Sequence, residues 1–351
     1  MKLYGALKTK MAIVIAVVTV CFGTMTALAV MQMTEQAITR MASKHAETII
    51  AWQKTVIEHV IDDSIAFANH LGSQQMVTDY LQQANPQEQY PRLLKYIDGL
   101  DADNRYQAIY IMDRTGRTLS STDPSFVGQN YAFRAYFKGA IAGKPTVDAA
   151  IGVTSGKFGY YFSCPIKTKS GKIIGVVVAK LKESLIADAL HPQNLSVDGA
   201  AMLVDTYGIV IQSDRPESLF KSLGTLSAKT RREIAETKRF NGVDISSLQY
   251  DWVAKEITTQ KELSEFVFYD QSHKRAELVG AARITDAPFF VVIIEARKIF
   301  AQAADNAEIE IGLLIFFAAV ATMLVLILLL LPLAQSLSDI KPPADNGHTE
   351  A

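Results

Sequence analysis

The segment Asn130–Lys180 reads NYAFRAYFKGAIAGKPTVDAAIGVTSGKFGYYFSCPIKTKSGKIIGVVVAK and is the most informative stretch of the chain. It contains an arginine among aromatic residues (Arg134), a small polar loop (Gly152–Ser155), an aromatic strand pattern (Tyr160–Phe162) and an apolar strand pattern that ends in Lys180. A guanidinium group matches a carboxylate with two parallel hydrogen bonds, and an ammonium group adds a compact charge. The segment therefore predicts a pocket for a small anion.

The same residues also have purely structural interpretations. Arg134 could be a surface cation stacked on Tyr131, and Lys180 could end a strand with its head group in solvent. Tyr136 and Tyr161 could be ordinary core aromatics, because aromatic residues are common in strands. The residues alone leave both interpretations open.

Composition and charge argue against several classes of protein. The 351 residues carry a net charge of −1, which gives no indication of a nucleic-acid partner. Cys21 lies in an apolar segment and Cys164 in mid-chain, so no disulfide is expected, and no Cys/His spacing indicates zinc. The sequence has neither a phosphate-binding loop nor a nucleophile–base pairing, so we expect no enzyme activity and no cofactor.

Two apolar segments raise the hydrophobic content to 49%. The first, residues 11–33, is long enough to span a bilayer and follows three lysines, which places residues 1–10 in the cytoplasm. The second, residues 311–334, would return the tail 335–351 to the cytoplasm. Residues 34–310 would then be periplasmic or extracellular in a two-pass protein of the bacterial inner membrane. The alternative for the first segment is a cleaved signal peptide, because its Ala-Leu-Ala sequence resembles a cleavage site.

Residues 34–100 are predicted to be helical. No proline or glycine occurs from Thr34 to Leu71, and apolar residues recur there at helical spacing. A helix of this length exceeds what one small core requires, so we expect a stalk that packs on its own domain. Its apolar stripe also predicts a homodimer through the stalk, and packing against its own domain alone is the alternative.

After residue 100 the hydrophobic period changes to that of strands, and it does so in two copies. Two strand–turn–strand patterns share a D-x-x-G turn, at Asp113–Gly116 and at Asp205–Gly208, and a later hairpin pattern follows each. We therefore expect an α+β fold with two tandem α/β modules that contain antiparallel sheets. Residues 101–190 would form the membrane-distal module and residues 191–300 the membrane-proximal one.

Four stretches carry a resemblance to a known family. They are FVGQNYAFRAYF (Phe126–Phe137), GYYFSCPI (Gly159–Ile166), GKIIGVVVAKL (Gly171–Leu181) and SLGTLSAKTRREIAETKRF (Ser222–Phe240). With the long helix, they resemble the double Cache domain, a tandem PAS-like sensor of bacterial receptors. The closer resemblance is to the sensor region of four-carbon dicarboxylate sensor histidine kinases of two-component systems. It implies that succinate, fumarate or malate binds in the membrane-distal module.

The resemblance also implies roles for individual residues. Arg134 and Lys180 would hold the carboxylates of the ligand, and Tyr136 and Tyr161 would offer phenol hydroxyl groups. The loop Gly152–Ser155 would close over the ligand. The other residues implied at the site are Asn130, Ser163, Thr154, Gly152 and Tyr131.

An amino acid is the alternative ligand, because amino-acid-binding Cache domains use an Arg-x-aromatic-aromatic element like Arg134–Phe137. Such a site also needs a carboxylate for the ammonium group of the ligand, and no acid occurs between Asp148 and Glu183. Lys180 would repel an ammonium group, so a dicarboxylate is favoured.

The resembling receptors continue into a kinase after the second span, whereas this sequence has no phosphoacceptor helix and no nucleotide-binding motif. We therefore expect signal transduction through the transmembrane helices to a separate membrane signalling protein. The alternatives are an accessory subunit of a kinase, cyclase or transporter, and a truncated receptor.

Overall fold

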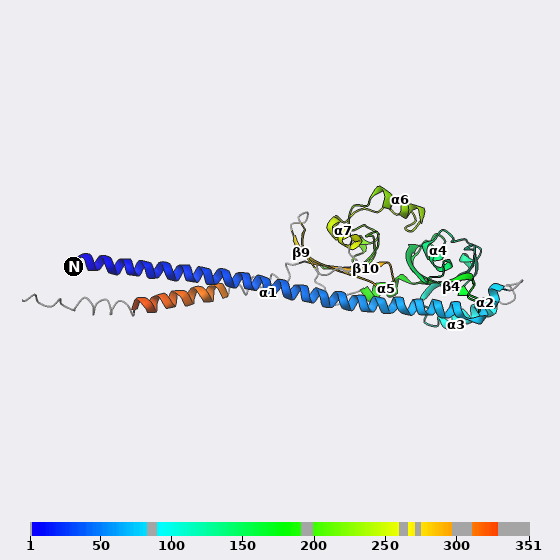
Figure 1. Ribbon diagram of the computed structural model, residues 1–351, viewed down its shortest axis with the longest axis horizontal. Coiled ribbons are helices and arrows are strands. Elements are labelled where there is room, and N and C mark those ends of the chain that lie inside the picture. The colour runs from blue at the N-terminus through cyan, green and yellow to red at the C-terminus, as the bar shows by residue number, and fades with distance from the viewer. Residues whose placement is uncertain are drawn as a thin grey trace, which may run out of the picture. The chain divides into compact units, whose positions relative to one another are not determined.

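The computed structural model describes residues 2–82, 90–190, 199–259, 266–270, 275–296 and 311–328. The chain divides into two compact units. One is Ser43–Ala296, and the other combines Met1–Ala42 with Arg297–Ala351. The first of these units contains two five-stranded antiparallel sheets, which are drawn as arrows in Figure 1.

The labels of Figure 1 are used for the helices and strands throughout. The described helices are α1 (Lys2–Ser73), α2 (Gln75–Gln82), α3 (Tyr90–Leu100), α4 (Ala135–Ile141), α5 (Glu183–Leu190), α6 (Ala228–Glu236) and α7 (Asp251–Thr259), with 3-10 turns η2 (Pro124–Phe126) and η3 (Pro216–Ser218). The described strands are β1 (Tyr106–Asp113), β2 (Thr118–Ser121), β3 (Thr146–Ile151), β4 (Phe158–Lys167), β5 (Ile173–Leu181), β6 (Ala200–Asp205), β7 (Val210–Ser213), β8 (Phe266–Asp270), β9 (Arg275–Arg283) and β10 (Phe289–Ala296).

The two sheets repeat one topology. The first module has the strand order β2-β1-β5-β4-β3, and the second module has β7-β6-β10-β9-β8. The shared D-x-x-G turn joins the first two strands of each copy, and its glycine has φ +86° at Gly116 and +79° at Gly208. Glycine takes such a φ without steric strain. The predicted fold class, two tandem modules with antiparallel sheets after a long helix, is confirmed.

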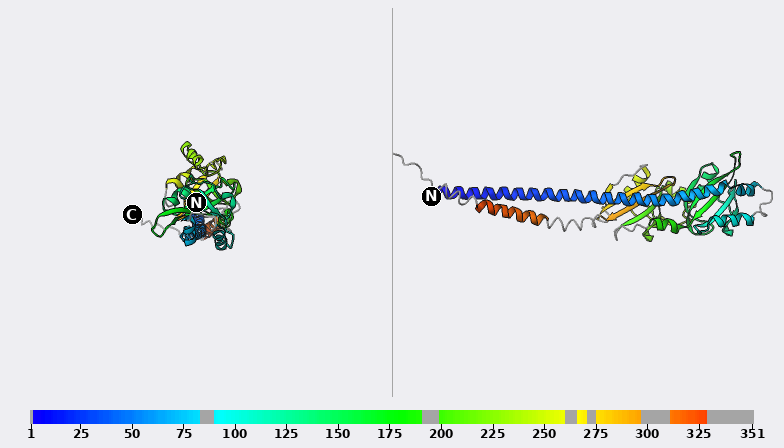
Figure 2. Two further views of the ribbon diagram at one scale, coloured as in Figure 1. Left: turned by 90° about the vertical axis from the view of Figure 1, so that its right-hand side faces the viewer. Right: turned by 90° about the horizontal axis from the view of Figure 1, so that it is seen from below.

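The Ser43–Ser73 part of α1 packs along both modules, as Figure 2 shows. Ile50 approaches β9 so closely that a Cβ added to Gly280 would lie 2.1 Å from its Cδ1 atom. Further along, the Phe67 ring stacks on the Tyr106 ring of β1 at 4.5 Å. One stripe of the helix thus joins both modules in a common core. Trp52 of α1 is 54% exposed, and dimerisation through this helix stays a prediction.

Each sheet has a second face that is packed away from the common core. In the first module, Ala108, Tyr110 and Met112 of β1 point to that face, whereas Ile109 and Ile111 point to the common core. This alternation is the expected period of a strand. The second face of the first module is covered by α4, and the second face of the second module by residues of α7.

Five helices and strands were not anticipated from the sequence: β3, β8, α4, α5 and α7. The β3 sequence TVDAAI carries a charged residue in its centre, and the α4 sequence AYFKGAI contains aromatic residues and a glycine that disfavour helix. Both elements form because they cover the edge and the face of a sheet that exists only after long-range pairing.

Two helices are long and apolar enough to cross a membrane, Ile13–Thr34 and Ile311–Leu328. A Cβ added at Gly23 would lie 3.5 Å from the Cβ of Ala319. The two helices therefore approach each other through small residues. The rest of the second predicted span and the predicted cytoplasmic tail lie outside the described residues.

Candidate ligand-binding site

The candidate site lies on the face of the first module that α4 covers. Tyr161 of β4 pairs directly with Lys180 of β5 and with Asp148 of β3. Residues opposed in this way point to the same face of a sheet, so the three form one row. The Tyr136 ring of α4 stacks on the Tyr161 ring at 4.8 Å with an interplanar angle of 5°. Three strands and one helix thus contribute to a single cluster.

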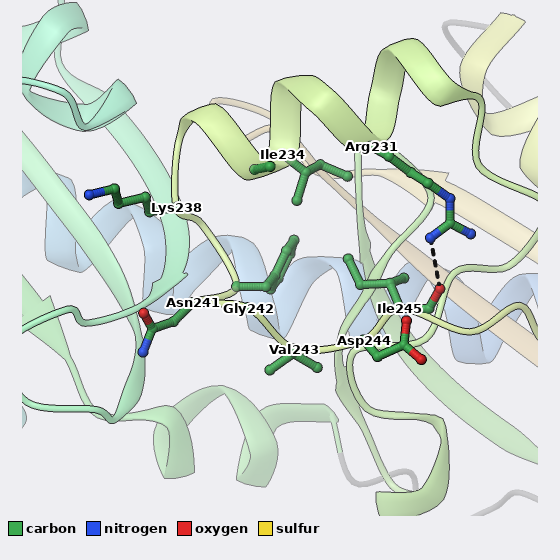
Figure 3. A pocket seen from close by; sticks show the side chains of 10 residues that line it. Arg231, Ile234, Lys238, Asn241, Gly242, Val243, Asp244 and Ile245 are labelled. Carbon is green, nitrogen blue, oxygen red and sulfur yellow. Dashed lines mark hydrogen bonds between the residues drawn. The ribbon is translucent and has the colours of Figure 1, made fainter.

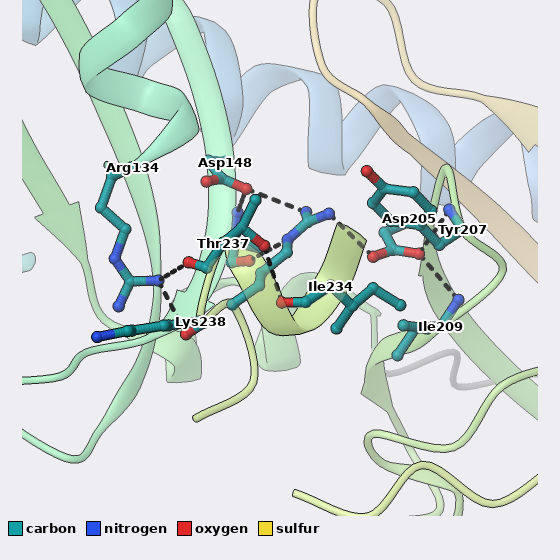
Figure 4. A network of polar contacts seen from close by, with 10 residues as sticks. Arg134, Asp148, Asp205, Tyr207, Ile209, Ile234, Thr237 and Lys238 are labelled. Carbon is teal, nitrogen blue, oxygen red and sulfur yellow. Dashed lines mark hydrogen bonds and ion pairs between the residues drawn. The ribbon is translucent and has the colours of Figure 1, made fainter. Parts of the chain in front are cut away.

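Arg134 stands at the N-cap position of α4 with an extended backbone, and only 2% of it is exposed. Its Nη2 donates to the carbonyl oxygen of Ile151 at 2.8 Å. Its Nη1 donates to the carbonyl oxygen of Lys238 at 3.2 Å, as Figure 4 shows. Lys238 belongs to the second module. The guanidinium group is therefore a buried link between the end of β3 and the segment after α6, and the interpretation as a surface cation is wrong.

Lys180 is fully buried. Its Nζ donates to Ser155 Oγ at 2.9 Å and to the carbonyl oxygen of Lys157 at 2.8 Å, and it lies 5.3 Å from the centre of the Tyr161 ring. Burial, followed by the charge of Arg134, lowers the pKa of Lys180 from 10.5 to about 8. The side chain therefore remains an ammonium group at neutral pH, and it does not reach solvent at the strand end.

The two cations have no carboxylate partner in the described part of the chain. Neither Arg134 nor Lys180 forms an ion pair there, and the positive charge of Arg134 helps to lower the pKa of Lys180. Buried charges in proteins are normally paired. Two buried cations held by hydroxyl and carbonyl oxygens form a site that can accept a small anion.

Gly152 allows three polar side-chain atoms to lie close to its backbone. A Cβ at this position would lie 2.6 Å from Ser155 Oγ, 3.0 Å from Lys180 Nζ and 3.1 Å from the Tyr161 hydroxyl oxygen. These are distances at which a side chain would displace its neighbours. The predicted Gly152–Ser155 loop is the turn between β3 and β4, and it brings Gly152 and Ser155 against the ammonium group.

The tyrosines of this face are arranged as hydrogen-bond donors. Tyr110 donates its hydroxyl proton to the Tyr136 oxygen at 2.9 Å, which leaves the Tyr136 proton for another acceptor. Burial raises the pKa of both Tyr136 and Tyr161, so both remain protonated. The Tyr131 hydroxyl lies 2.6 Å from Thr154 Oγ1 and joins the segment before α4 to the β3–β4 turn.

Two predicted site residues bond to backbone groups instead. Ser163 Oγ donates to the carbonyl oxygens of Tyr136 at 2.8 Å and Thr146 at 3.0 Å. Asn130 is exposed, and its amide bonds the Thr115 carbonyl at 3.1 Å and the Ala132 N–H at 2.9 Å. These contacts hold α4 and its entry segment in position. They do not bring Asn130 or Ser163 to the two cations.

Some residues of the cluster were not singled out from the sequence. Ser155 was expected only as part of the closing loop, and its hydroxyl contacts Lys180 directly. Tyr110 carried no signal, because an aromatic residue in an apolar strand is usually core. Asp148 and Arg239, which form a buried ion pair at 3.1 Å, carried none either, since 91 positions in the sequence separate them.

The second module contains a groove of about 290 Å³ between α6 and the loop that follows it (Figure 3). Ile234, Phe240 and Ile245 are its buried apolar residues, and Arg231 lies at its exposed rim, where Nη1 donates to the Ile245 carbonyl at 3.4 Å. The cation at this groove, Arg231, is exposed, whereas the two cations on the face under α4, Arg134 and Lys180, are buried.

A match to one known family covers most of the region between the two apolar helices. The Cache domain family matches residues 29–303 of the 351. The chain belongs to the Cache domain family. A Cache domain is a ligand-binding module rather than a catalytic one, and the predicted resemblance to a double Cache sensor is confirmed.

Curated relatives of this Cache chain include two dicarboxylate sensors. The C4-dicarboxylate transport sensor protein DctB of Pseudomonas aeruginosa is 35% identical over 164 residues, which cover 44% of this chain and 26% of that protein. The DctB of Rhizobium meliloti is 26% identical over 163 residues, which cover 45% and 25%. The chain thus matches about a quarter of the length of these relatives.

Solved Cache structures share the fold. The sensor domain of the histidine kinase DctB from V. cholerae matches with a TM-score of 0.60 at 21% identity, covering 73% of this chain and 98% of that domain. The ligand-binding domain of the Pseudomonas fluorescens chemoreceptor CtaA, in complex with L-leucine, matches with a TM-score of 0.53 at 15% identity, covering 76% and 99%. At these identities the likeness establishes the fold.

Proposed function

We propose that the chain is a membrane-anchored extracytoplasmic receptor for a small dicarboxylate such as succinate, fumarate or malate. The observation that carries the proposal is the pair of buried cations, Arg134 and Lys180, neither of which forms an ion pair with a carboxylate of the described residues. A dianionic ligand supplies two negative charges to this site. The similarity to proteins named C4-dicarboxylate transport sensors supports the same class of ligand.

Each cation would take one carboxylate of the ligand. Arg134 offers a planar fork, Lys180 a point charge, and Tyr136 and Tyr161 hydroxyl donors. Gly152 lets the Lys180 ammonium group approach the β3–β4 turn, and Tyr131 with Thr154 would close the site from the loop side. Asn130 and Ser163 would act by holding the backbone in place.

The expected affinity is micromolar. A hydrogen bond to a charged group contributes roughly 1.5–3 kcal/mol. A few such bonds, reduced by the entropy lost on association, give a binding free energy of about −8 kcal/mol, which is a dissociation constant of about 1 μM.

The signal would leave the domain through the two apolar helices, in a two-pass protein of the inner membrane with residues 34–310 in the periplasm. Ligand would tighten the first module, and α1 or the second module would pass the change to the spans. A homodimer along α1 and a separate membrane signalling protein are the proposed partners. Cysteine crosslinks along α1 that form at the same rate with and without ligand would contradict this relay.

An amino acid is the second candidate ligand, since the row that contains Lys180 and Tyr161 also contains a buried carboxylate, Asp148. In an amino-acid site, a carboxylate of this kind would accept the ammonium group of the ligand. The two candidates differ in charge, so one binding experiment separates them.

The test is calorimetric binding and thermal unfolding of the full chain in detergent, with dicarboxylates, monocarboxylates and amino acids. A ligand at 100 times its dissociation constant stabilises the fold by about 2.7 kcal/mol. We expect this for succinate or malate, and we expect Arg134→Ala and Lys180→Ala each to abolish it. Lys138→Ala is the matched control, because Lys138 is an exposed cation on α4. Binding of amino acids alone would replace the dicarboxylate by the second candidate, and binding of none of these ligands would refute both.

A further inference from the structure

The boundary between the modules contains a buried arginine between two buried carboxylates (Figure 4). Arg239 follows α6, and its Nη2 lies 3.1 Å from Asp148 Oδ1 while its Nη1 lies 3.1 Å from Asp205 Oδ2. Its Nε donates to the Ala149 carbonyl at 2.8 Å, and its own carbonyl accepts from the Ile151 N–H at 2.9 Å. None of the three charged residues is more than 8% exposed. The arginine is therefore fixed on both sides.

Asp148 belongs to the face of the candidate site. It lies opposite Tyr161, which in turn lies opposite Lys180. Arg134 and Asp148 act on the same phenol, because the guanidinium lowers and the carboxylate raises the pKa of Tyr161. An unpaired carboxylate here would repel a ligand carboxylate and attract a ligand ammonium group.

Arg239 is held in place from the second module. Asp205 Oδ1 accepts the backbone N–H groups of Tyr207 and Ile209, each at 2.9 Å, within the D-x-x-G turn after β6. Its other oxygen faces Arg239. The turn thus positions Asp205, Asp205 positions Arg239, and Arg239 neutralises Asp148 of the first module.

We propose that Arg239 determines the charge selectivity of the candidate site. By pairing with Asp148, it offsets the charge of the carboxylate that lies in one row with Tyr161 and Lys180, so that the positive charge of Arg134 and Lys180 prevails and a dianion is preferred over a ligand that carries an ammonium group. The inference rests on the proposed dicarboxylate function and names a specificity-determining residue outside the ligand's reach. It also explains how a site with an acid in its row can still favour an anion.

The experiment compares two probes of similar length, succinate and 4-aminobutyrate, in which an ammonium group replaces one carboxylate. Their dissociation constants are measured by calorimetry on the full chain in detergent, and the readout is the ratio of the 4-aminobutyrate constant to the succinate constant. We expect Arg239→Gln to lower this ratio by about tenfold or more, because an uncompensated charge several ångströms away acts on the two probes with opposite sign. The double variant Asp148→Asn/Arg239→Gln should restore the ratio.

Asp205→Asn is the matched control, because it breaks the other ion pair of Arg239 while the Ala149 carbonyl and the Ile151 N–H still hold the arginine beside Asp148. It should not lower the ratio. If Arg239→Gln fails to fold, Asp148→Asn provides the test alone, since removal of the acid should raise the ratio.

The outcomes separate this inference from the proposed function. An unmodified chain that binds neither probe would refute the proposed function and the inference with it. Succinate binding in the unmodified chain, with a ratio that Arg239→Gln leaves unchanged, would overturn the inference alone and make Arg239 a structural residue. An unchanged or lower ratio in Asp148→Asn would also overturn it.

Discussion

The first and second modules share one strand order, and the faces under α4 and α7 can be compared position by position. Ala108 and Ala200 stand five residues before the aspartate of the shared turn. The residue paired with each on the neighbouring strand is Lys180 in the first module and Ile294 in the second. One strand further, Tyr161 corresponds to Val279.

The position of Arg134 can be compared between the two modules in the same way. The Tyr131 N–H donates to the Gly116 carbonyl, and the Leu223 N–H donates to the Gly208 carbonyl in the second module. Arg134 lies three residues after Tyr131, and Leu226 lies three residues after Leu223. A leucine therefore occupies the position of the arginine in the second module.

The face of the second module is formed by a cluster of apolar residues, among them Met202, Val204, Val279, Ala281, Phe290, Val292 and Ile294. The two faces therefore differ in a few positions while the backbone plan is kept. Topology supplies a covered sheet face in both modules, and the candidate site arises only where side chains on that face are charged.

The comparison predicts its largest effect for a cation placed in the second module. Ile294→Lys should destabilise the protein by about 3–5 kcal/mol, because a buried ammonium group would lack the oxygen partners that Lys180 has. Chemical unfolding measures the change, and Ile294→Met, which should change stability by less than about 1.5 kcal/mol, is the control. Equal stabilities of the Lys and Met variants would mean that the two faces do not differ in this way.

Removal of the cation from the first module should have two effects of opposite sign. Lys180→Met should lower succinate affinity about a hundredfold, which corresponds to about 2.7 kcal/mol. The unliganded protein should be as stable or more stable, by up to about 4 kcal/mol, since a buried charge is replaced by an apolar group of similar length. Calorimetry and unfolding of the same variant measure both quantities. A loss of stability together with affinity would show that Lys180 serves the fold.

The lowered pKa of Lys180 predicts a pH dependence. Because the pKa falls from 10.5 to about 8 on folding, the unfolded chain binds more protons between these values, and the stability of the unliganded protein should rise with pH across that interval. Below about pH 8 the destabilising effect of the charge is fully present. Succinate affinity should instead fall above about pH 8, by about tenfold per pH unit, as the ammonium group loses its proton. Lys180→Met, measured in parallel, should show neither trend.

The smallest effects concern two glycines of the β3–β4 turn. Gly152→Ala should lower succinate affinity roughly tenfold, because its Cβ would displace Ser155 Oγ and Lys180 Nζ. Gly156 has φ +65° and no atom within 4 Å of an added Cβ, so Gly156→Ala should reduce stability by about 1 kcal/mol and leave affinity unchanged. Titration and thermal unfolding of both variants distinguish the two roles. Equal losses of affinity would point to the shape of the turn instead of the close contacts at Gly152.

Local patterns predicted much of the fold. The apolar length of two segments, the helical spacing before Leu71 and the repeated D-x-x-G turn required only near neighbours, and each corresponds to an element of the structure. The same patterns did not reveal β3 or α4, because the short sequences of both elements favour strand or helix only weakly. Pairing with β4 stabilises β3, and packing on the sheet stabilises α4.

The sequence by itself determined the class of this protein and the residue types of its candidate site: a long helix, two tandem modules, and an arginine and a lysine in the first module. Only the tertiary structure decided that both cations are buried and that Arg134 bonds to Lys238, 104 positions away. It also decided that Arg239 neutralises Asp148 across the module boundary. The physical reason is that period and turn chemistry act between neighbours, whereas burial and ion pairing depend on which distant segments the packed sheets bring together.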